Sequence, residues 1–449
     1  MRSRLRAERL ARDARRGGDE QRVRVWRQQR VAHRPEMSHV NGAARGVVIT
    51  GAGAICSLGD TRAAIHAALC DGRAGFGAPT VFGADLSCGY DVAEVRDFAP
   101  QTYLGERNLR PLDRTGRLAA VAAELALADS GWSVDRRRAH ELGVILGTMF
   151  CSVRTIGEFD RRGQQAGPEY ASPLDFSNTV LNAAAGQIAI WHNLRGVNST
   201  ISTGAASGLH AIGYGAQLIR AGRAAALMAG GAEELCFESF YGFLRANLLS
   251  RRDADRPGCA VPFDARRSGC ALGEGAAFVV LESEETAANR GARVIGRIDG
   301  FAAAYDPRQD VDARREPYAL AHAITGALAD AGVPGSAVGA VSASANGSPM
   351  QDAREASAIR AAIGSRTAVT AVKSGVGETL GASGALQVMM MLESLQTGRL
   401  PGIVGLEDPD PAIDLDLVAV QPRPIRASRA LVTASAVEGN CCALVVSAG

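Results

Sequence analysis

The chain has 449 residues, of which 47% are hydrophobic and 5% aromatic, a balance typical of a soluble, closely packed α/β protein and one that excludes a disordered or fibrous chain. Its formal net charge of +2 is unevenly spread: residues 1–36 hold twelve arginines against five acidic residues, so the remainder carries about −5. That remainder has no basic stripe of the kind that nucleic-acid-binding proteins carry.

Residues 1–44 are predicted to form an Arg-rich arm outside the folded core. The first 36 residues contain no apolar run long enough for a signal peptide or a membrane span. The arm could be an amphipathic or nucleic-acid-binding segment, but we favour a disordered tail or a mis-called start with Met37 as the true initiator. We therefore predict no membrane or nucleic-acid partner. The rest of the chain is predicted to fold in two halves, 45–290 and 291–449.

The first predicted strand, 47–50, ends in Gly51-Ala52-Gly53 and is followed by a turn and a helix from about Thr61. The glycines resemble part of a dinucleotide-binding motif. The third glycine of that motif is replaced by Cys56, however, and no acidic residue ends a well-placed second strand. We expect no nicotinamide site and no other cofactor.

Strands and helices then alternate along the chain. The predicted helices are 115–130, 182–190, 208–221, 317–331, 352–363 and 381–397. The predicted strands are 144–146, 225–229, 276–281, 294–298, 338–343, 367–372, 430–434 and 443–447. Two successive β/α blocks of similar makeup predict two similar halves, with mostly parallel sheets covered by helices.

The nine cysteines form no CxxC pair, which favours reduced thiols in a cytoplasmic protein and predicts no metal site. The adjacent pair Cys441-Cys442 could indicate metal or redox chemistry, but small-residue core packing within a strand is the better interpretation. Of the 49 basic residues only Lys373 is a lysine.

Four segments in order resemble the β-ketoacyl synthases: AGGAE at 229–233, PFDARRSG at 262–269 with LGEG at 272–275, NGSPMQD at 346–352 with Glu355, and KSGVGETLGASG at 373–384. The resemblance spans about 47–446. It implies a thiolase-like α/β fold, in which two similar βα halves form a five-layered αβαβα core, normally in a dimer. The structural motif residues are Pro262, Phe263, Asp264, Gly273, Glu274 and Gly275.

The reactive residues of that family are missing from the matching positions. The family places its nucleophilic cysteine in a TACxxGxH turn, and the matching stretch 202–210 carries Ala205 there. The two catalytic histidines align with Ser344 and Glu378. A methyl group cannot form a thioester, and neither replacement supplies the imidazole that supports malonyl decarboxylation.

Neighbouring residues offer weak substitutes. The hydroxyls of Ser202, Thr203 and Ser207 lie at least two positions from the expected nucleophile, and the one base candidate is Glu378. His210 is expected to be an ordinary helix histidine. Cys151 and Cys236 are expected to be buried, inert thiols.

Polar residues around the expected catalytic centre are retained. Lys373, Asp352 and Glu355 match family positions, and a buried ammonium needs a carboxylate partner. We expect Lys373 to pair with Glu355, Glu378 or both, either as a core ion pair or as a relic site for a malonyl or acyl group. The family's GFGGTN phenylalanines are absent, since Val-Glu-Gly-Asn stands at 437–440.

The resemblance therefore implies a chain length factor, a non-condensing partner that pairs with a ketosynthase subunit as a heterodimer, meets acyl carrier protein through that complex and shapes the acyl tunnel. Residues 150–176 are candidates for its lining. Such partners usually carry glutamine at the cysteine position. Because this chain has Ala205 there, any decarboxylating role attributed to that glutamine cannot be transferred to it. The alternatives are an active 3-oxoacyl-carrier-protein synthase or acyltransferase using a non-standard residue, or a binding module that has kept the fold.

Overall fold

The computed structural model describes residues 45–83, 86, 89–106, 109–133, 135, 142–251, 260–307 and 318–449. The predicted arm, 1–44, lies outside the described residues, as do Cys88 and Cys259. Residues 45–449 form one compact unit.

The sheet of the N-terminal half contains five strands. In spatial order they are β1 (Val47–Cys56), β5 (Gly275–Ser283), β4 (Ala226–Glu233), β2 (Gly143–Gly147) and β3 (Asn198–Ile201). The first two neighbouring pairs in this order are antiparallel and the last two are parallel.

The C-terminal half repeats this arrangement. Its strands in spatial order are β6 (Gly296–Tyr305), β13 (Asn440–Ala448), β12 (Arg429–Ser435), β7 (Ala340–Ser342) and β8 (Ala368–Thr370), with β10 (Asp416–Leu417) at the edge. The pairs again run antiparallel, antiparallel, parallel, parallel. β1 and β6 join the halves into an eleven-stranded sheet, while β9 (Arg399–Leu400) and β11 (Arg423–Pro424) form a separate pair.

The prediction of mostly parallel sheets is wrong, because both halves are mixed. Each half ends in a strand, β5 or β13, that runs antiparallel to both of its neighbours. Continuous apolar runs indicate that a strand is buried on both faces, which β5 and β13 are, but they carry no information on strand direction.

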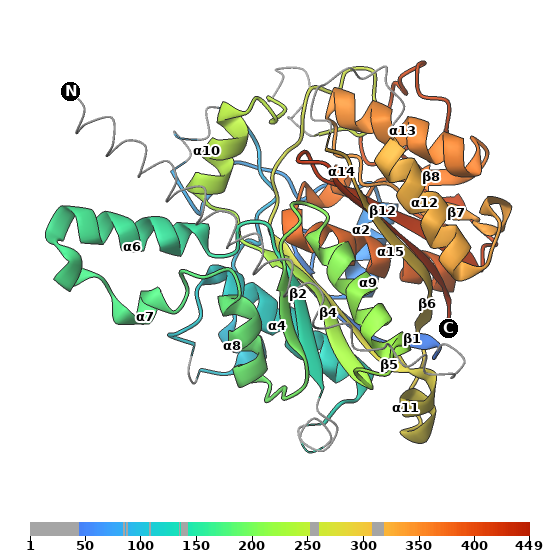
Figure 1. Cartoon of the computed structure of the whole chain (residues 1–449). Coiled ribbons are helices and arrows are strands. Elements are labelled where there is room, and N and C mark those ends of the chain that lie inside the picture. The colour runs from blue at the N-terminus through green and yellow to red at the C-terminus, as the bar shows by residue number, and fades with distance from the viewer. Residues whose placement is uncertain are drawn as a thin grey trace, which may run out of the picture. The chain divides into compact units, whose positions relative to one another are not determined.

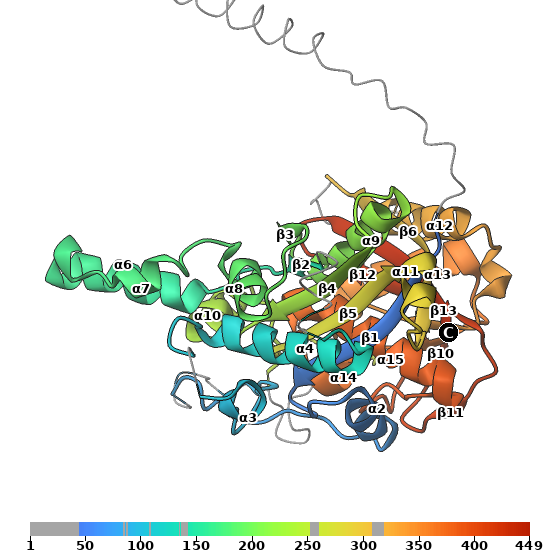
Figure 2. The same cartoon turned by 90° about the horizontal axis from the view of Figure 1, so that it is seen from below.

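Helices cover the sheet in layers (Figures 1 and 2). α4 (Arg114–Ser130) and α8 (Ala183–Trp191) pack together beside the first half. α12 (Tyr318–Ala331) and α13 (Pro349–Ile363) do so beside the second. α9 (Ser207–Arg220) and α15 (Ser383–Thr397) contact each other and strands of both halves, which gives the five layers of a thiolase-like fold.

The remaining described helices connect these layers. They are α2 (Arg62–Cys70), α3 (Gln101–Leu104), α6 (Val153–Ala166), α7 (Pro173–Phe176), α10 (Phe237–Arg245), α11 (Glu284–Asn289), α14 (Lys373–Val376), and short 3₁₀ turns at 168–170, 335–337 and 380–382. The sequence did not predict α6, which contains two glycines and has no buried residue. No helix in the described part of the chain combines the length and apolarity needed to cross a bilayer.

The first strand is longer than predicted. β1 continues through Gly51 and Gly53 to Cys56, with an irregular register between Ile49 and Gly51. A Cβ on Gly51 would lie 2.5 Å from Ser130 N, and one on Gly53 would overlap the backbone of α4. These glycines therefore allow a helix to pack directly on the strand, and the strand ends at Cys56 instead of at the predicted Gly51–Gly53.

Close helix packing at the centre of the molecule positions the candidate site. A Cβ on Gly208 of α9 would overlap the carbonyl oxygen of Gly381, and one on Gly384 of α15 would lie 2.6 Å from Leu209 N. These contacts bring the turn before α9 beside the loop before α15. Ala205 lies on the first of these segments and Glu378 on the second.

Candidate functional site

Ala205 lies in the sharp turn between β3 and α9, where Gly204 has a left-handed backbone with φ +62°. Its methyl group lines a cavity of about 20 Å³. The other described lining residues are Met149, Phe243, Asn346, Gln351, Glu378, Leu380, Ser435, Val437 and Glu438. None of these is a cysteine or a histidine, and the space is about that of one water molecule.

The hydroxyl groups beside this turn are all engaged elsewhere. Ser207 is fully buried, and its Oγ donates to Gly204 O at 2.6 Å and Thr148 O at 3.1 Å. Ser202 Oγ donates to Met149 O at 3.3 Å. Thr203 Oγ1 lies 2.8 Å from Nδ1 of His210. None of the three side chains lines the cavity, so none of them stands in for the missing thiol.

His210 is a packed helix histidine, as predicted. Besides its contact with Thr203, its ring lies edge-on against Phe301, with the centroids 5.9 Å apart. Burial lowers the pKa of His210, which favours the neutral imidazole.

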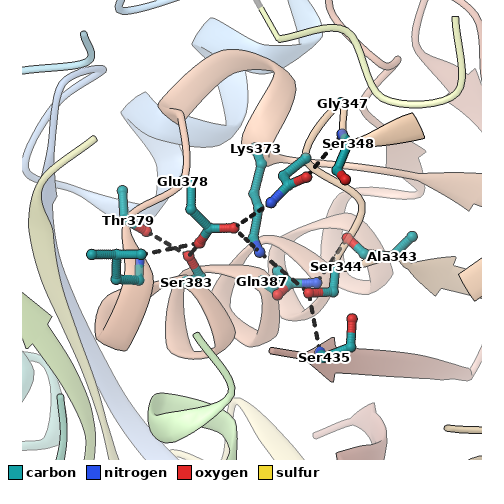
Figure 3. A network of polar contacts seen from close by, with 12 residues as sticks. Ala343, Ser344, Gly347, Ser348, Lys373, Glu378, Thr379, Ser383, Gln387 and Ser435 are labelled. Carbon is teal, nitrogen blue, oxygen red and sulfur yellow. Dashed lines mark hydrogen bonds and ion pairs between the residues drawn. The ribbon is translucent and has the colours of Figure 1, made fainter. Parts of the chain in front are cut away.

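Glu378 forms a buried ion pair with the single lysine (Figure 3). Lys373 Nζ lies 2.7 Å from Glu378 Oε2, and the two side chains are 1% and 2% exposed. Asn346 Nδ2 also donates to Oε2, at 2.9 Å, while Ser383 Oγ and Leu380 N donate to Oε1 at 2.9 and 3.1 Å. An ionised carboxylate accepts about four hydrogen bonds, so this group has no free position from which to act as a base.

Ser344 ties the same network to β12. Its Oγ accepts from Lys373 Nζ at 3.2 Å and from Ser435 N at 3.3 Å, as the dashed lines of Figure 3 mark. A hydroxyl in this position orients the ammonium and a backbone amide. It cannot reproduce the imidazole of a condensing enzyme.

Glu355 and Asp352 support the network from α13. Glu355 Oε1 accepts from Ser344 N at 2.8 Å and from Thr433 Oγ1 at 2.6 Å. Asp352 accepts from the backbone of Phe263 and Asn346 at 3.0 and 3.1 Å. Burial raises the pKa of both carboxyls, that of Asp352 to about 7. The predicted partnership of Lys373 is confirmed for Glu378, while Glu355 serves the backbone after β7.

The PFD segment, 262–264, and the GEG segment, 273–275, lie on different sides of the site. Phe263 has φ +65°, and Asp264 binds the guanidinium of Arg266 at 2.9 Å, so Pro262–Asp264 form a fixed loop beside α13. Glu274 pairs with Arg114 at 2.5 Å. Gly273 N donates to Glu378 O at 3.0 Å, so the Gly273–Gly275 segment supports the loop that carries Glu378.

The cysteines predicted to be inert are buried. Burial raises the pKa of Cys151 and that of Cys236 to about 12, so both are neutral thiols near pH 7. Cys441 and Cys442 lie in β13, where Cys442 packs in the core as predicted. No cluster of three or more His, Cys, Asp and Glu suited to a metal ion occurs among the described residues.

The structure brings Ala205, Glu378 and, behind them, Ser344 and Lys373 to one place. Sequence reasoning did not assign Met149, Phe243 and Glu438 to the cavity, because they belong to three separate loops and helices. The arrangement offers a satisfied polar network beside a methyl group. Among the described residues that line the cavity, none supplies a thiol or an imidazole.

Two sequence profiles of known proteins match most of the chain. The sequence profile described as "Beta-ketoacyl synthase, N-terminal domain" matches residues 44–287, and "Beta-ketoacyl synthase, C-terminal domain" matches residues 295–407. The chain is 32% identical over 384 residues to a 3-oxoacyl-[acyl-carrier-protein] synthase 2 of Synechocystis sp., covering 84% of this chain and 92% of that protein.

Two further matches are a polyketide synthase subunit and a solved structure. The tetracenomycin polyketide synthase ketoacyl synthase beta subunit of Streptomyces glaucescens is 34% identical over 410 residues, covering 89% of this chain and 98% of that one. A solved structure titled "The ishigamide ketosynthase/chain length factor" superposes with a TM-score of 0.83 at 30% identity, covering 91% of this chain and all of that one.

Proposed function

Because the chain belongs to the β-ketoacyl synthase family, we propose that it is a chain length factor, a non-condensing subunit that forms a heterodimer with a catalytic ketosynthase in polyketide, polyene or fatty-acid-type biosynthesis. One observation carries the proposal. At the turn before α9, where the family's nucleophile would emerge, Ala205 presents a methyl group. The cytoplasm is the expected location.

The surrounding side chains support the same conclusion. Losing one nucleophile in a well-studied hydrolase costs on the order of a millionfold in turnover. Here the candidate substitutes are also engaged in other contacts: Ser207 donates to backbone oxygens, Glu378 is paired with Lys373, and Cys151 is a buried thiol with a raised pKa.

Residues 170–190 expose several large apolar side chains, and we propose that they bind a partner. We call this surface the α7–α8 face; its members are Tyr170, Leu174, Phe176, Val180, Leu181 and Ile190. Phe176 is 63% exposed and Ile190 84% exposed. Apolar side chains gathered in one segment of a soluble protein are typical of a protein–protein contact. α6 and α7 also project away from the sheet in both views (Figures 1 and 2).

In this proposal the partner ketosynthase covers the α7–α8 face and holds the growing chain, and residues 150–176 line the shared tunnel. Each added two-carbon unit needs free volume in a close-packed interface, so these side chains set the length at which growth stops. The acyl carrier protein would act as a partner of the complex, because the described residues that line the cavity at Ala205 include no thiol that could receive an acyl group.

Reconstitution tests the proposal. The purified chain, a ketosynthase carrying the complete Cys/His/His set, and both together are incubated with acyl and malonyl carrier protein, and the products are identified by mass spectrometry. We expect products from the pair, with lengths that change when side chains in 150–176 are altered. Condensed product from the chain alone would instead establish the alternative, an active synthase using a non-standard residue.

A further inference from the structure

A second and much larger cavity lies outside the site at Ala205. It measures about 500 Å³, against about 20 Å³ at Ala205, and the two cavities share no described lining residue. Four segments enclose it: the end of β1 with the turn after it, the loop 74–76, the stretch 94–99 and two residues of α3. Sites that take small organic ligands measure about 300–1,000 Å³, so this volume suits one such ligand.

Hydrogen bonds hold the walls of this cavity in place. Gly75 N donates to Gly375 O at 2.9 Å, which ties the loop after α2 to α14. A Cβ on Gly75 would overlap Ser57 Oγ, so this loop lies tightly against the turn after β1. On the other side, Val95 N donates to Glu274 Oε1 at 2.9 Å. The cavity is therefore bounded by backbone that the fold keeps fixed, as a preformed ligand site requires.

Negative charge predominates along the cavity wall. Three carboxylates, those of Asp60, Glu94 and Asp97, line it together with one guanidinium, that of Arg96, which leaves a net charge of −2. The guanidinium is directed along the wall, where its NH2 donates to Ala78 O at 2.8 Å. Within the part of the chain that the structure describes, none of the three carboxylates forms an ion pair.

Two of these carboxylates have acceptor positions left for a ligand. Asp60 Oδ2 accepts from the hydroxyl of Tyr103 at 2.6 Å, whereas a carboxylate can accept about four hydrogen bonds. That hydrogen bond raises the pKa of Tyr103 to about 12, so the phenol stays neutral. Asp97 is exposed, and its carboxylate forms no hydrogen bond with another described residue. Glu94 is already engaged, because its two oxygens accept from Thr80 N and Oγ1 at 2.7 and 2.6 Å.

Aromatic rings form the apolar part of the wall. Phe76, Phe98 and Tyr103 all line the cavity. Phe98 already has a cation over its ring, because the guanidinium carbon of Arg114 lies 5.7 Å from the ring centroid. Ring faces attract ammonium and guanidinium groups, and they also cover the apolar body of a ligand. Rings and carboxylates in one cavity therefore favour an organic cation.

The same features disfavour other classes of ligand. A phosphate or carboxylate ligand would meet a net negative charge. A neutral apolar ligand would displace water from the carboxylates without replacing its hydrogen bonds. A metal ion needs several ligand atoms close together, and no group of three or more His, Cys, Asp and Glu suited to a metal occurs among the described residues.

We propose that this cavity binds an organic ammonium ion, whose ammonium group donates to the carboxylates of Asp60 and Asp97 while its apolar body lies against the aromatic rings. The proposal goes beyond the non-condensing function and does not depend on it, because the cavity at Ala205 shares none of these residues.

Isothermal titration calorimetry on the full-length chain tests the proposal with three molecules of similar size. The probe is 2-phenylethylamine, which is protonated at neutral pH. The alcohol 2-phenylethanol lacks the charge, and 3-phenylpropionate reverses it. We expect saturable binding of the amine that weakens with added salt, binding of the alcohol that is about tenfold weaker or more, and no detectable binding of the acid.

Two substitutions remove one charge each at nearly constant volume: Asp60→Asn and Asp97→Asn. Asp97 has φ +52°, a conformation that asparagine also adopts readily, so at least this variant is expected to fold. Each substitution is expected to raise the dissociation constant of the amine by about threefold to tenfold. Glu285→Gln, which removes an exposed glutamate on α11, is the matched control and leaves binding unchanged. Thermal denaturation verifies that each variant is folded.

Three results would overturn the proposal: no saturable binding of the amine, equal affinities for the amine and the alcohol, or an affinity that neither Asp60→Asn nor Asp97→Asn lowers. Tighter binding of 3-phenylpropionate than of the amine would also overturn it and would indicate an anion site. None of these measurements involves condensation, so a failure here leaves the non-condensing role intact. Product formed by the chain alone would refute that role without affecting this site.

Discussion

Lys373 and Glu378 form an ion pair of 2.7 Å in which both side chains are almost completely buried. Asn346, Ser383 and Leu380 N complete the hydrogen bonds of the carboxylate. Glu378 stands where the family resemblance places a catalytic histidine. Its contacts make it the counter-ion of a structural network, which explains how the fold is maintained without the imidazole.

Removing one partner of this pair leaves the other charged and unpaired in the protein interior. Glu378→Gln is expected to lower the free energy of unfolding by about 3–5 kcal/mol, as measured by urea denaturation. The double variant Lys373→Met/Glu378→Leu removes both charges and is expected to be close to the wild type in stability. A loss below about 1 kcal/mol in the single variant would show that the pair has no structural role.

Ala205 contributes no reacting atom, so shortening it further leaves turnover intact. In the complex with a ketosynthase, Ala205→Gly is expected to change the condensation rate by less than about twofold, against the millionfold scale of a lost nucleophile. The matched control is replacement of the ketosynthase cysteine by alanine, which abolishes product. A large loss with Ala205→Gly would mean that this turn takes part in the chemistry.

Glu233 is expected to make the free energy of unfolding depend on pH. It is fully buried at the end of β4, where burial raises its pKa from 4.5 to about 7. The folded state therefore retains a proton that the unfolded chain releases above about pH 4.5. This contribution is fully present below pH 4.5 and is lost as the pH rises through 7.

The stability difference between the wild type and Glu233→Gln isolates this contribution, because the variant carries no titrating group at the position. We expect the wild type to lose stability relative to the variant as the pH rises from about 4.5 to 7.5. The free energies of unfolding are measured by urea denaturation at several pH values. A difference that does not change with pH would contradict the raised pKa.

The α7–α8 face is expected to bury its apolar side chains against the ketosynthase. Ile190→Arg would place a guanidinium in that contact. It is expected to raise the dissociation constant of the heterodimer by about tenfold or more, measured by analytical ultracentrifugation. Tyr305→Arg replaces another exposed apolar residue, on β6, and serves as the control. Equal effects of the two substitutions would argue against the face as the interface.

The α/β character and most strand and helix positions could be predicted because their apolar runs are continuous and buried. β5 and α15, for example, follow their predicted ranges closely. The ion pair could be predicted because a lone buried lysine demands a carboxylate. The division at 290/291 remains a prediction.

Other features depend on contacts that no local pattern records. Strand direction was missed because β5 and β13 have the same apolar runs as parallel strands. The sequence pattern predicts that the first strand ends at Gly51 and Gly53, although these glycines lie within it and allow the close approach of α4. Phe243 and Glu438 reach the cavity from segments nearly 200 residues apart, so only the folded chain shows that they share it.

The central claim is that this subunit never carries the acyl group, and intact-protein mass spectrometry tests it most directly. The heterodimer is incubated with acyl carrier protein bearing a saturated acyl chain, without malonyl groups, and both subunits are weighed. The account predicts that the ketosynthase gains the mass of one acyl group while this chain keeps its unmodified mass. A stoichiometric acyl adduct on this chain would contradict it.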